Sequence, residues 1–576
     1  MPSTILILTA NFEAPNYLSS SPAPWVSQQP KGRPTPLRSA TGRSITSPSW
    51  PPWQPSLVRL RDQPHPCPDL DLHNFTSLVG YDTAVIGGTM SLDSFVRDFG
   101  IDNMTPSERD NSQANIASMF QVGAFFGALL TFPVAEKYGR KRAIMTAALV
   151  FCVGGAMMSG ANGMLELVYA GRAIGGLGIG MATMTVPVYI AETSPPSIRG
   201  RLVGVFEIFS QGGGMLGFWI NYATDRTIDE RERAQWIVPL ALQLLPAVLL
   251  FFGIMFCPES PRWLARGDDF EAAEKVLVYI RGLPVDHPYV QNEMREIRQQ
   301  VEERSTMRLS KKQQFRKLLA PGTRNRVGVG AFVMFLQSFT GVNIMTYFSP
   351  RIFETLGIVG TSNKLFSTGI YGVAKMLGMI LFAVWVVEKI GRRGGLLWGS
   401  VIGSLPLWYV GGYVMIADPA TNAAEGNIQL SGWGYFAMVC IYLHSFIICA
   451  TIQGITWTYA AEIFPLDVRM FCVAISTAST WLGSFVVARA TPFMITDLGY
   501  GTYFMFAGFL IGIGLWSFFC VPETKGVSLE EMDALFSRPT HLAVWAQLRG
   551  RPILPQDNIS VVESMDKNDA KVDEVA

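Results

Sequence analysis

The chain has 576 residues, of which 49% are hydrophobic and only 16% are charged, and its formal net charge is +1. Soluble domains carry charge on roughly a quarter of their residues, so this composition is typical of a membrane protein. A net charge this close to zero argues against a nucleic-acid partner. The seven cysteines contain no Cys-x-x-Cys pair, so we expect neither a disulfide framework nor a metal site, and no cofactor is indicated.

Residues 1–72 are rich in proline and serine, a composition that cannot form a packed core. We expect a disordered tail, or non-native sequence from a gene-prediction error, such as a retained intron or a wrong start, that ends just before Gly80. Asp69, Asp71 and His73 stand close before that glycine. The first membrane helix is therefore expected to lack its cytoplasmic half. A real but shortened helix is the alternative, and it would leave Asp82 close to water.

Apolar runs of about 20 residues, the length that crosses ~30 Å of hydrocarbon, fall into two groups of six. The first group, within residues 73–257, comprises a weak segment at 75–92 and stronger ones at 113–135, 143–161, 166–190, 201–222 and 236–257. The second, within residues 327–521, comprises segments at 327–350, 365–387, 395–417, 433–459, 470–493 and 501–520. The sequence thus predicts an all-α membrane protein with twelve transmembrane helices in two six-helix bundles.

Residues 258–326 lie between the two groups, and residues 522–576 form a C-terminal tail. Charged residues at helical spacing in 268–275 and 293–303 predict short soluble helices in the linker. Lysines and arginines concentrate in the short loops on one side of the predicted membrane, as at 140–142 and 389–393. The positive-inside rule places that side, and with it both termini, in the cytoplasm.

An arginine, Arg172, lies inside the apolar, glycine-rich segment 166–190. Hydrocarbon tolerates a buried charge only where a partner or a water-filled cavity receives it. We therefore expect a membrane protein with a charged interior.

Three motifs recur in the same order in the two groups of helices. The repeated pairs are Glu136-Lys-Tyr-Gly-Arg140 with Glu388-Lys-Ile-Gly-Arg392, Tyr189-x-x-Glu192 before Arg199 with Tyr459-x-x-Glu462 before Arg469, and Pro258-Glu-Ser with Pro522-Glu-Thr. Alternating access needs two similar rigid halves around a site near the midplane of the membrane, so these repeats predict a transporter. No nucleophile-base pair, phosphate loop or metal-ligand cluster points to an enzyme.

These motifs, with Gly80-Tyr-Asp82 and Pro522-Glu-Thr-Lys-Gly526, resemble the sugar porter family of the major facilitator superfamily over about residues 80–538. Gly217–Tyr222 and Gly411–Asp418 look most like fungal quinate permeases and their sugar-transporting relatives. The resemblance implies proton-coupled uptake of a sugar or related polyhydroxy compound across the plasma membrane. Its partners would be that solute, protons and the lipid bilayer. A quinate permease, a facilitative uniporter and a nutrient sensor are the alternatives.

The resemblance also implies that Asp82 takes up the proton and that Arg172 adjusts the proton affinity of the Asp82 carboxyl. Burial favours the protonated carboxyl and a nearby guanidinium favours the ionised one, so a moving arginine can load or release a proton. A static structural ion pair is the alternative.

For substrate binding, the resemblance points to Gln337, Asn343 and Tyr347 in the seventh helix and to Trp457 in the tenth. The first three lie near one helical face, although ordinary bonding between helices would also use them. The chain departs from the residues usual in the family's sugar transporters, which we call the sugar pattern. Ser338 replaces the second glutamine of the seventh helix, and Glu207 replaces a glutamine of the fifth. Thr480 and Ser484 replace asparagines of the eleventh helix, and these departures argue against hexose specificity.

Lys375 lies near the middle of the eighth helix, where a lone ammonium should neutralise or find an anion. One interpretation makes Lys375 a specificity residue that binds a substrate carboxylate, as on quinate. The other pairs it with Glu207 across the two halves, and this structural pair is slightly favoured.

Within the family, the loop arginines matched by Arg140 and Arg392 meet the acids matched by Glu192 and Glu462 when the inner gate is shut. Several such pairs at a closing interface can bias a two-state equilibrium, although each exposed pair contributes only ~0–1 kcal/mol. The alternative is that these charges only fix the topology. The full set of expected gating residues also contains Glu136, Arg199, Glu388 and Arg469.

Overall fold

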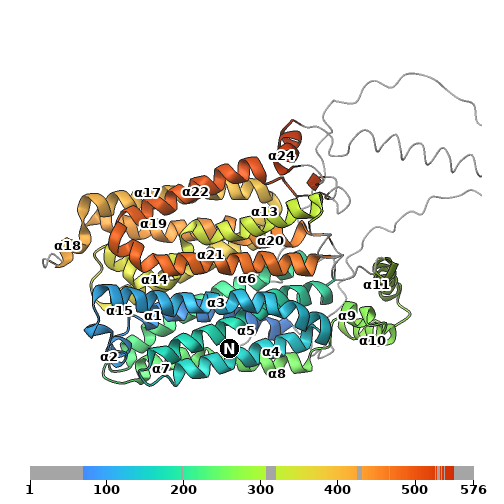
Figure 1. Cartoon of the computed structure of the whole chain (residues 1–576), viewed down its shortest axis with the longest axis horizontal. Coiled ribbons are helices and arrows are strands. Elements are labelled where there is room, and N and C mark those ends of the chain that lie inside the picture. Colours follow the sequence, from blue (N-terminus) through green and yellow to red (C-terminus); the bar gives the residue numbers. More distant parts are fainter. Residues whose placement is uncertain are drawn as a thin grey trace, which may run out of the picture. The chain divides into compact units, whose positions relative to one another are not determined.

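The computed structural model describes residues 69–195, 199–306, 319–424, 431–465 and 468–525, with short stretches between 527 and 549. Regular structure in these residues is entirely helical (Figure 1). The helices of the first half are α1 (Asp69–Thr89), α2 (Asp93–Asp98), η2 (Ile101–Asn103), α3 (Pro106–Tyr138), α4 (Arg140–Ser159), α5 (Leu165–Thr193), α6 (Arg199–Thr227), α7 (Ala234–Leu242) and α8 (Leu244–Phe256).

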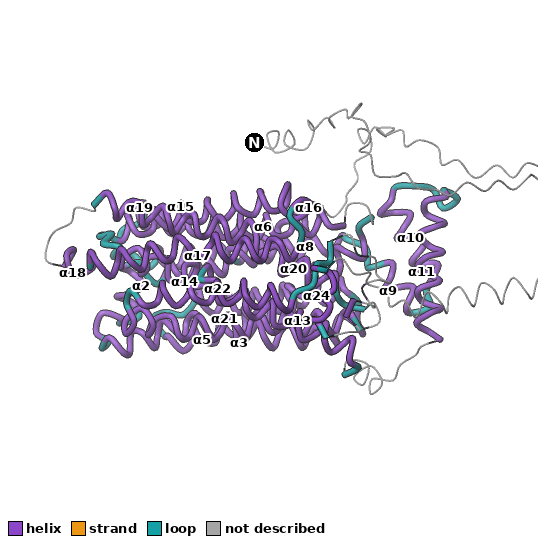
Figure 2. Tube along the Cα trace, turned by 90° about the horizontal axis from the view of Figure 1, so that it is seen from above, coloured by secondary structure: helices purple, strands orange, loops and turns teal. Residues whose placement is uncertain are grey.

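The helices of the second half run alongside those of the first (Figure 2) and are interrupted by more short turns. Its helices are α13 (Pro321–Gln337), η3 (Ser338–Thr340), α14 (Val342–Thr355), α15 (Thr361–Leu381), η4 (Phe382–Val386), α16 (Val387–Lys389), α17 (Arg392–Ala417), α18 (Pro419–Ala424), α19 (Gly432–Ile448), η5 (Cys449–Gln453), α20 (Gly454–Glu462), α21 (Arg469–Leu498) and α22 (Gly501–Cys520). The linker holds α9 (Pro261–Arg266), α10 (Phe270–Arg281) and α11 (Pro288–Thr306), and α24 (Thr540–Leu548) follows α22. The prediction of short linker helices is confirmed.

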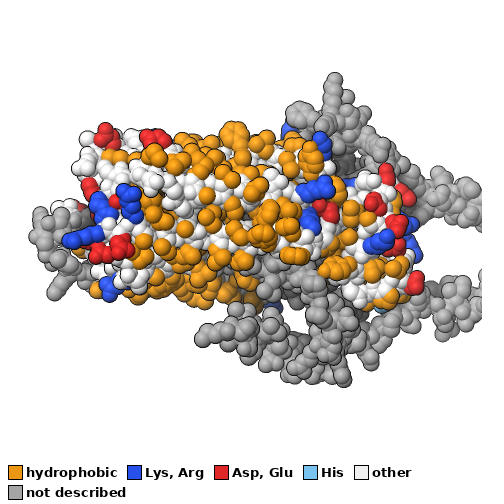
Figure 3. All heavy atoms as spheres, turned by 90° about the horizontal axis from the view of Figure 1, so that it is seen from below, with side chains coloured by type: hydrophobic (Ala, Val, Ile, Leu, Met, Phe, Trp, Pro, Cys, Tyr) orange, Lys and Arg blue, Asp and Glu red, His pale blue; other side chains and the backbone are white. Residues whose placement is uncertain are grey.

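Ten helical segments of the described chain are long and apolar enough to cross a membrane. The two other expected spans, α1 and α6, pack against each other and carry more polar side chains, among them Asp82 and Glu207. Large apolar side chains such as Phe126, Leu216 and Trp398 remain exposed on the outer surface. Figure 3 shows apolar atoms over the middle of the molecule and charged side chains towards its ends. This distribution and the ten apolar spans confirm an all-helical membrane fold, and the packing of α1 against α6 is consistent with twelve spans.

The first helix extends further than its apolar segment. α1 begins at Asp69 and has 21 residues, which corresponds to about 31 Å at 1.5 Å per residue. The polar residues before Gly80 continue the helix, but α1 is not among the described helices apolar enough to cross a membrane, so the truncation of the span stays a prediction. Asp82 is fully buried, so the exposure expected from a shortened helix is absent. That the residues before Gly80 come from a gene-prediction error stays a prediction, which the sequence of the transcript tests.

The segment predicted as one helix at 327–350 is two helices joined by a short 3-10 turn. Gly341 has a φ of 93° between η3 and α14, a conformation that favours glycine. Discontinuous helices expose backbone and side chains next to binding sites in many transporters. The break separates Gln337, at the end of α13, from Asn343, at the start of α14.

Two further predicted spans contain π-helical turns, η4 and η5, which contact each other. Such turns are rare and often accompany functional sites. They divide the segments predicted at 365–387 and 433–459.

The two halves meet along three pairs of helices. α3 packs on α21, α6 on α15, and α1 on α14. α3 begins with a capping box, in which Thr105 and Glu108 satisfy each other's backbone amides ahead of Pro106. The polar cap sets the start of a 33-residue helix that runs the length of this interface.

Candidate functional site

A buried ion pair joins α1 and α5 inside the first half. Arg172 Nη1 donates to Asp82 Oδ1 at 3.2 Å and to Oδ2 at 3.1 Å, and both side chains are fully buried. Breaking a buried pair by removing one partner is strongly destabilising, because the remaining charge is left uncompensated. The charged interior expected from the sequence is therefore present, and the partner of Arg172 is the carboxylate that the resemblance indicated.

Further contacts hold the guanidinium of Arg172. Its Nε donates to the carbonyl of Ile116 at 3.2 Å, and its central carbon lies 4.4 Å from the centre of the Phe120 ring. The remaining nitrogen, Nη2, has no hydrogen-bond partner in the described chain. The arginine thus keeps the two N–H groups of Nη2 for water or a bound molecule.

Tyr347 of α14, in the second half, lies near this ion pair. Its side chain is buried, and its hydroxyl is close enough to feel the charges of Arg172 and Asp82. The amide of Gln121, on α3, lies beside that hydroxyl, and neither of its polar atoms has a well-formed hydrogen bond in the described chain. The ion pair therefore borders the interface between the halves, where movement of one half can alter its surroundings.

The other expected substrate residues lie in the second half. Gln337 Oε1 accepts a hydrogen bond from Thr456 Oγ1 at 2.7 Å, and Asn343 Nδ2 donates to Ser484 Oγ at 3.2 Å. Ser484 is also 3.1 Å from Ser338 Oγ. Two positions that depart from the sugar pattern are thus in contact with each other, and one of them, Ser484, also bonds to an expected binding residue. Trp457 packs against the core of the second half and is only partly buried.

Sequence reasoning missed two side chains at this interface. Trp481 of α21 packs edge-on against Phe120 at a centroid distance of 5.8 Å, and its indole N–H is buried with no partner in the described chain. The two polar atoms of the Gln121 side chain are likewise buried without a well-formed hydrogen bond in the described chain. Buried polar groups are normally hydrogen-bonded, so both side chains hold polar atoms that remain available to water or a bound molecule. A glutamine and a tryptophan in apolar helices carry too weak a signal to be selected from sequence.

Glu207 and Lys375 lie on α6 and α15, which pack against each other across the halves. They do not form the direct ion pair that the sequence slightly favoured. Lys375 Nζ donates to Thr346 Oγ1 at 3.1 Å, and among the described residues no contact within ion-pair distance joins the two charges.

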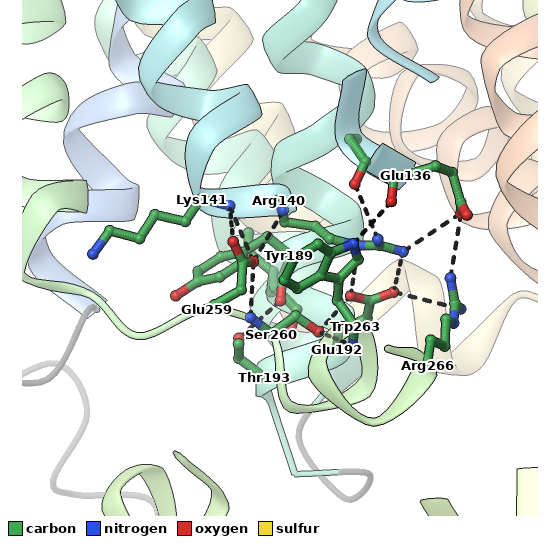
Figure 4. Close-up of polar contacts among 12 residues, drawn as sticks. Glu136, Arg140, Lys141, Tyr189, Glu192, Thr193, Glu259, Ser260, Trp263 and Arg266 are labelled. Carbon is green, nitrogen blue, oxygen red and sulfur yellow. Dashed lines mark hydrogen bonds and ion pairs between the residues drawn. The ribbon is translucent and has the colours of Figure 1, made fainter. Parts of the chain in front are cut away.

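At the end of the bundle that carries Arg140, the repeated motifs come together (Figure 4). Arg140 Nε lies 2.9 Å from Glu192 Oε2, and Ser260 Oγ donates to the same oxygen at 2.6 Å. Glu259 Oε1 accepts from the backbone amides of Arg140 at 2.9 Å and Lys141 at 3.2 Å. The Glu259 carboxylate therefore caps the first turn of α4, a position that favours negative charge.

Burial raises the pKa of the Glu259 carboxyl, while the backbone donors of Ser260, Lys141 and Arg140 and the charge of Arg140 offset part of this effect.

The second half builds the same cluster from the same motifs. Arg392 Nη2 lies 2.6 Å from Glu462 Oε1, and Thr524 Oγ1 donates to Glu462 Oε2 at 3.0 Å. Glu523 accepts from the backbone amides of Arg392 and Arg393 at 2.9 and 3.0 Å. Each half thus carries its own polar cluster, whose contacts join residues of that half alone. Glu259 and Glu523 were not selected as site residues, although their repeated Pro-Glu-Ser/Thr triplets were visible.

The remaining expected gating residues have varied surroundings. Glu136 Oε1 is 3.3 Å from Arg266 Nη1 and 3.8 Å from Arg140 Nη2, and Arg469 donates to the carbonyl of Phe464 at 3.4 Å. Arg199 begins α6, but its side chain and that of Glu388 lie outside the described residues. The gating roles of the whole set stay predictions.

Replacing Gly139 with alanine should destabilise the protein. Gly139 has a φ of 95°, and a Cβ built there would lie 2.3 Å from Glu259 Oε2, so both the backbone and the capping carboxylate would have to shift. We expect a loss of ~1–3 kcal/mol, measured as a lower melting temperature of the purified protein in detergent. Gly508→Ala, in open space on α22, is the control. Equal melting temperatures for the two variants would contradict the capping role.

A second polar cluster lies at the opposite end and, unlike the first, joins the two halves. We call it the Arg351 clasp; it comprises Arg351 of α14, Arg489 and Thr496 of α21, and Asp110, Asn111, Gln113 and Asn115 of α3. Arg351 Nη1 lies 2.7 Å from Asp110 Oδ1, and Thr496 Oγ1 donates to Asp110 Oδ2 at 2.6 Å. Arg489 donates to Asn115 and Asn111 at 3.0 and 2.9 Å. None of the sequence motifs predicted this cluster.

Two similar helical bundles around a buried charged interface, with polar clusters at both ends, define a membrane transporter with the major facilitator fold. The sequence profile of the family "Sugar (and other) transporter" matches residues 75–536. The chain belongs to this family and is a transporter, not an enzyme.

Relatives and solved structures agree with this assignment. The probable quinate permease of Aspergillus clavatus is 41% identical over 488 residues, which cover 83% of this chain and 89% of that protein. The quinate permease of Emericella nidulans is 41% identical over 473 residues, 81% of this chain and 87% of that protein. The proton:xylose symporter XylE bound to 6-bromo-6-deoxy-D-glucose has a TM-score of 0.66 at 25% identity, covering 81% of this chain and 98% of that one.

Proposed function

We propose that this protein couples the entry of protons to the uptake of a polyhydroxy compound by alternating access. Asp82 carries the proton, and Arg172 stabilises the carboxylate whenever the proton has left. Gln337, Asn343, Tyr347 and Trp457 contribute to the substrate site between the halves. The two halves rock about this site, so that it opens to one face of the membrane at a time.

The observation that supports the proposal most directly is the fully buried pair of Asp82 and Arg172 beside Tyr347 of the other half. Ionisable residues inside membrane proteins are rare and commonly belong to ion or proton pathways. A carboxylate whose counter-ion lies near a moving interface can change its protonation when the halves move. The similarity to a solved proton:xylose symporter favours the same coupling.

We also propose the plasma membrane as its location, with both termini and the Arg140 end on the cytoplasmic side. The support is the concentration of arginine and lysine at 140–142 and 389–393, which the positive-inside rule assigns to the cytoplasm. Protease protection of tags at either terminus in intact fungal cells tests this orientation. Tags that are cleaved from outside would contradict it.

The proposed function predicts accumulation driven by an acid gradient. The purified protein in liposomes should concentrate at least one compound from a panel of hexoses, pentoses and quinate when the outside is made acidic. One pH unit corresponds to about tenfold accumulation for one proton per solute. A protonophore should reduce this to equilibration. Equilibration with or without the gradient would mean facilitated diffusion instead, and binding without movement would favour a sensor.

A further inference from the structure

Glu207 and Lys375 are opposite charges on different halves that lie near each other without pairing. Glu207 is 7% exposed and Lys375 is 9% exposed, and their charges are close enough to interact. Lys375 uses one of its three donors, on Thr346 Oγ1 at 3.1 Å. Glu207 makes no hydrogen bond within the described residues. Each charge is therefore buried with most of its bonding capacity unused.

The Glu207 carboxylate oxygens are not among the fully enclosed atoms that lack a partner, so they keep some access to water or to a bound molecule. A third group can therefore bond to both side chains and satisfy both charges. That group must present a negative charge to the Lys375 ammonium and must donate hydrogen bonds to the Glu207 carboxylate. One molecule meets both requirements if it carries a carboxylate and hydroxyl groups a few bonds apart.

The surroundings narrow the class of ligand further. Lys375 offers a single positive charge, and its Nζ lies 5.7 Å from the centre of the Tyr371 ring. The other titratable groups that face it are Glu207 and the thiol of Cys449. No second cation among them could hold a dianion such as a phosphate ester, and Glu207 would repel one. A neutral sugar could bond to both side chains but would leave the ammonium without an anion.

The position of Lys375 connects it with the expected substrate site. Thr346, its partner, directly precedes Tyr347 on α14 and also lies 3.3 Å from the hydroxyl of Tyr371. Thr346 therefore fixes the ammonium beside the helix that carries Asn343 and Tyr347.

From this geometry we infer that Lys375 and Glu207 select a polyhydroxy monocarboxylate as the substrate. The substrate carboxylate binds the Lys375 ammonium, and a hydroxyl group of the same molecule donates to the Glu207 carboxylate. The inference rests on the proposed function and names its substrate class, an organic hydroxy acid instead of a neutral sugar.

The substrate class has an electrical consequence. A monoanion that enters with one proton moves no net charge, whereas a neutral sugar with one proton moves one positive charge. A membrane potential of 100 mV can then support up to ~fifty-fold accumulation of the neutral sugar and none of the hydroxy acid. The dependence of uptake on potential therefore separates the two classes independently of any mutation.

The experiment uses the purified full chain in liposomes with an acid exterior and labelled quinate as the probe. We expect quinate to accumulate, its methyl ester to compete at least tenfold more weakly, and a potassium-diffusion potential to leave accumulation unchanged. Lys375→Gln should weaken quinate uptake tenfold or more and remove the preference for acid over ester. Lys375→Arg, which keeps the charge, should retain that preference.

Lys364→Gln is the matched control, because Lys364 lies on the same helix but pairs with Glu354. It should behave as the unmodified protein does. Unchanged quinate affinity in Lys375→Gln, or accumulation of a neutral sugar that follows the potential, would overturn the inference and leave proton-coupled transport intact. A failure of the proposed function differs, since no solute would then accumulate under the acid gradient. Size-exclusion profiles of both Lys375 variants show whether either has lost its fold.

Discussion

Replacing Asp82 with asparagine is expected to abolish proton-driven accumulation while sparing exchange of substrate across the membrane. Asparagine keeps an oxygen that accepts a hydrogen bond from Arg172, which donates to both carboxylate oxygens at 3.1–3.2 Å. It cannot carry the proton. The accumulation ratio in liposomes under one unit of pH gradient should fall from about tenfold to about one.

Counterflow in the same liposomes checks that the variant still moves substrate. We expect an exchange rate within a few-fold of the unmodified protein, because that reaction needs no net proton transfer. Asp93→Asn is the matched control, since it removes an exposed carboxylate outside the spans. Accumulation by Asp82→Asn equal to that of the control would show that the proton travels elsewhere. The buried pair would then be structural, which is the alternative that the sequence left open.

Removing the Arg351 clasp should shift the balance between the two open states. Arg351 and Asp110 join the halves at the end opposite Arg140 and are mostly buried, with side-chain exposures of 25% and 7%. A hydrogen bond to a charged group contributes about 1.5–3 kcal/mol, so its loss should change the ratio of the two states tenfold or more. We expect Arg351→Gln combined with Asp110→Asn to favour the state that is open at this end.

Spin labels at Asn103 and Asn363 can report this change, because both positions are exposed on opposite halves at the clasp end. The labels are introduced in a background in which the native cysteines are replaced. The label-to-label distances, measured by pulsed electron paramagnetic resonance, should become longer in the double variant. Arg97→Gln is the control, since Arg97 pairs with Asp98 within one half at the same end. Identical distributions in the double variant and the control would mean that the clasp does not hold this end closed.

The membrane class and the two-fold repeat could be predicted from the sequence. Hydrophobic length and the position of basic residues are local properties, and the bilayer selects for both directly. The family resemblance implied that Arg140 and Arg392 would meet Glu192 and Glu462, and those contacts are present. A charge inside a helix such as Arg172 demands a partner, so its pairing could also be anticipated.

Other features depend on which helix faces meet, and helical periodicity does not encode this. The distance between Glu207 and Lys375 is one example, because neighbouring helices can bring two charges together or hold them apart. The Arg351 clasp is another, since its members on α3 lie more than 200 residues before those on α14 and α21. The helical extent of α1 is a third, since the helix continues through polar residues to Asp69, beyond the apolar segment that marks a span in the sequence.

The sequence by itself determined that this protein crosses a membrane in two related halves and carries paired charges inside. Solvent, bilayer thickness and the cost of a buried charge act on each segment separately, so their effects can be read along the chain. Only the tertiary structure decided which charges meet across the halves and which buried groups keep free bonding capacity. Those outcomes follow from side-chain packing between helices, which depends on every neighbour at once.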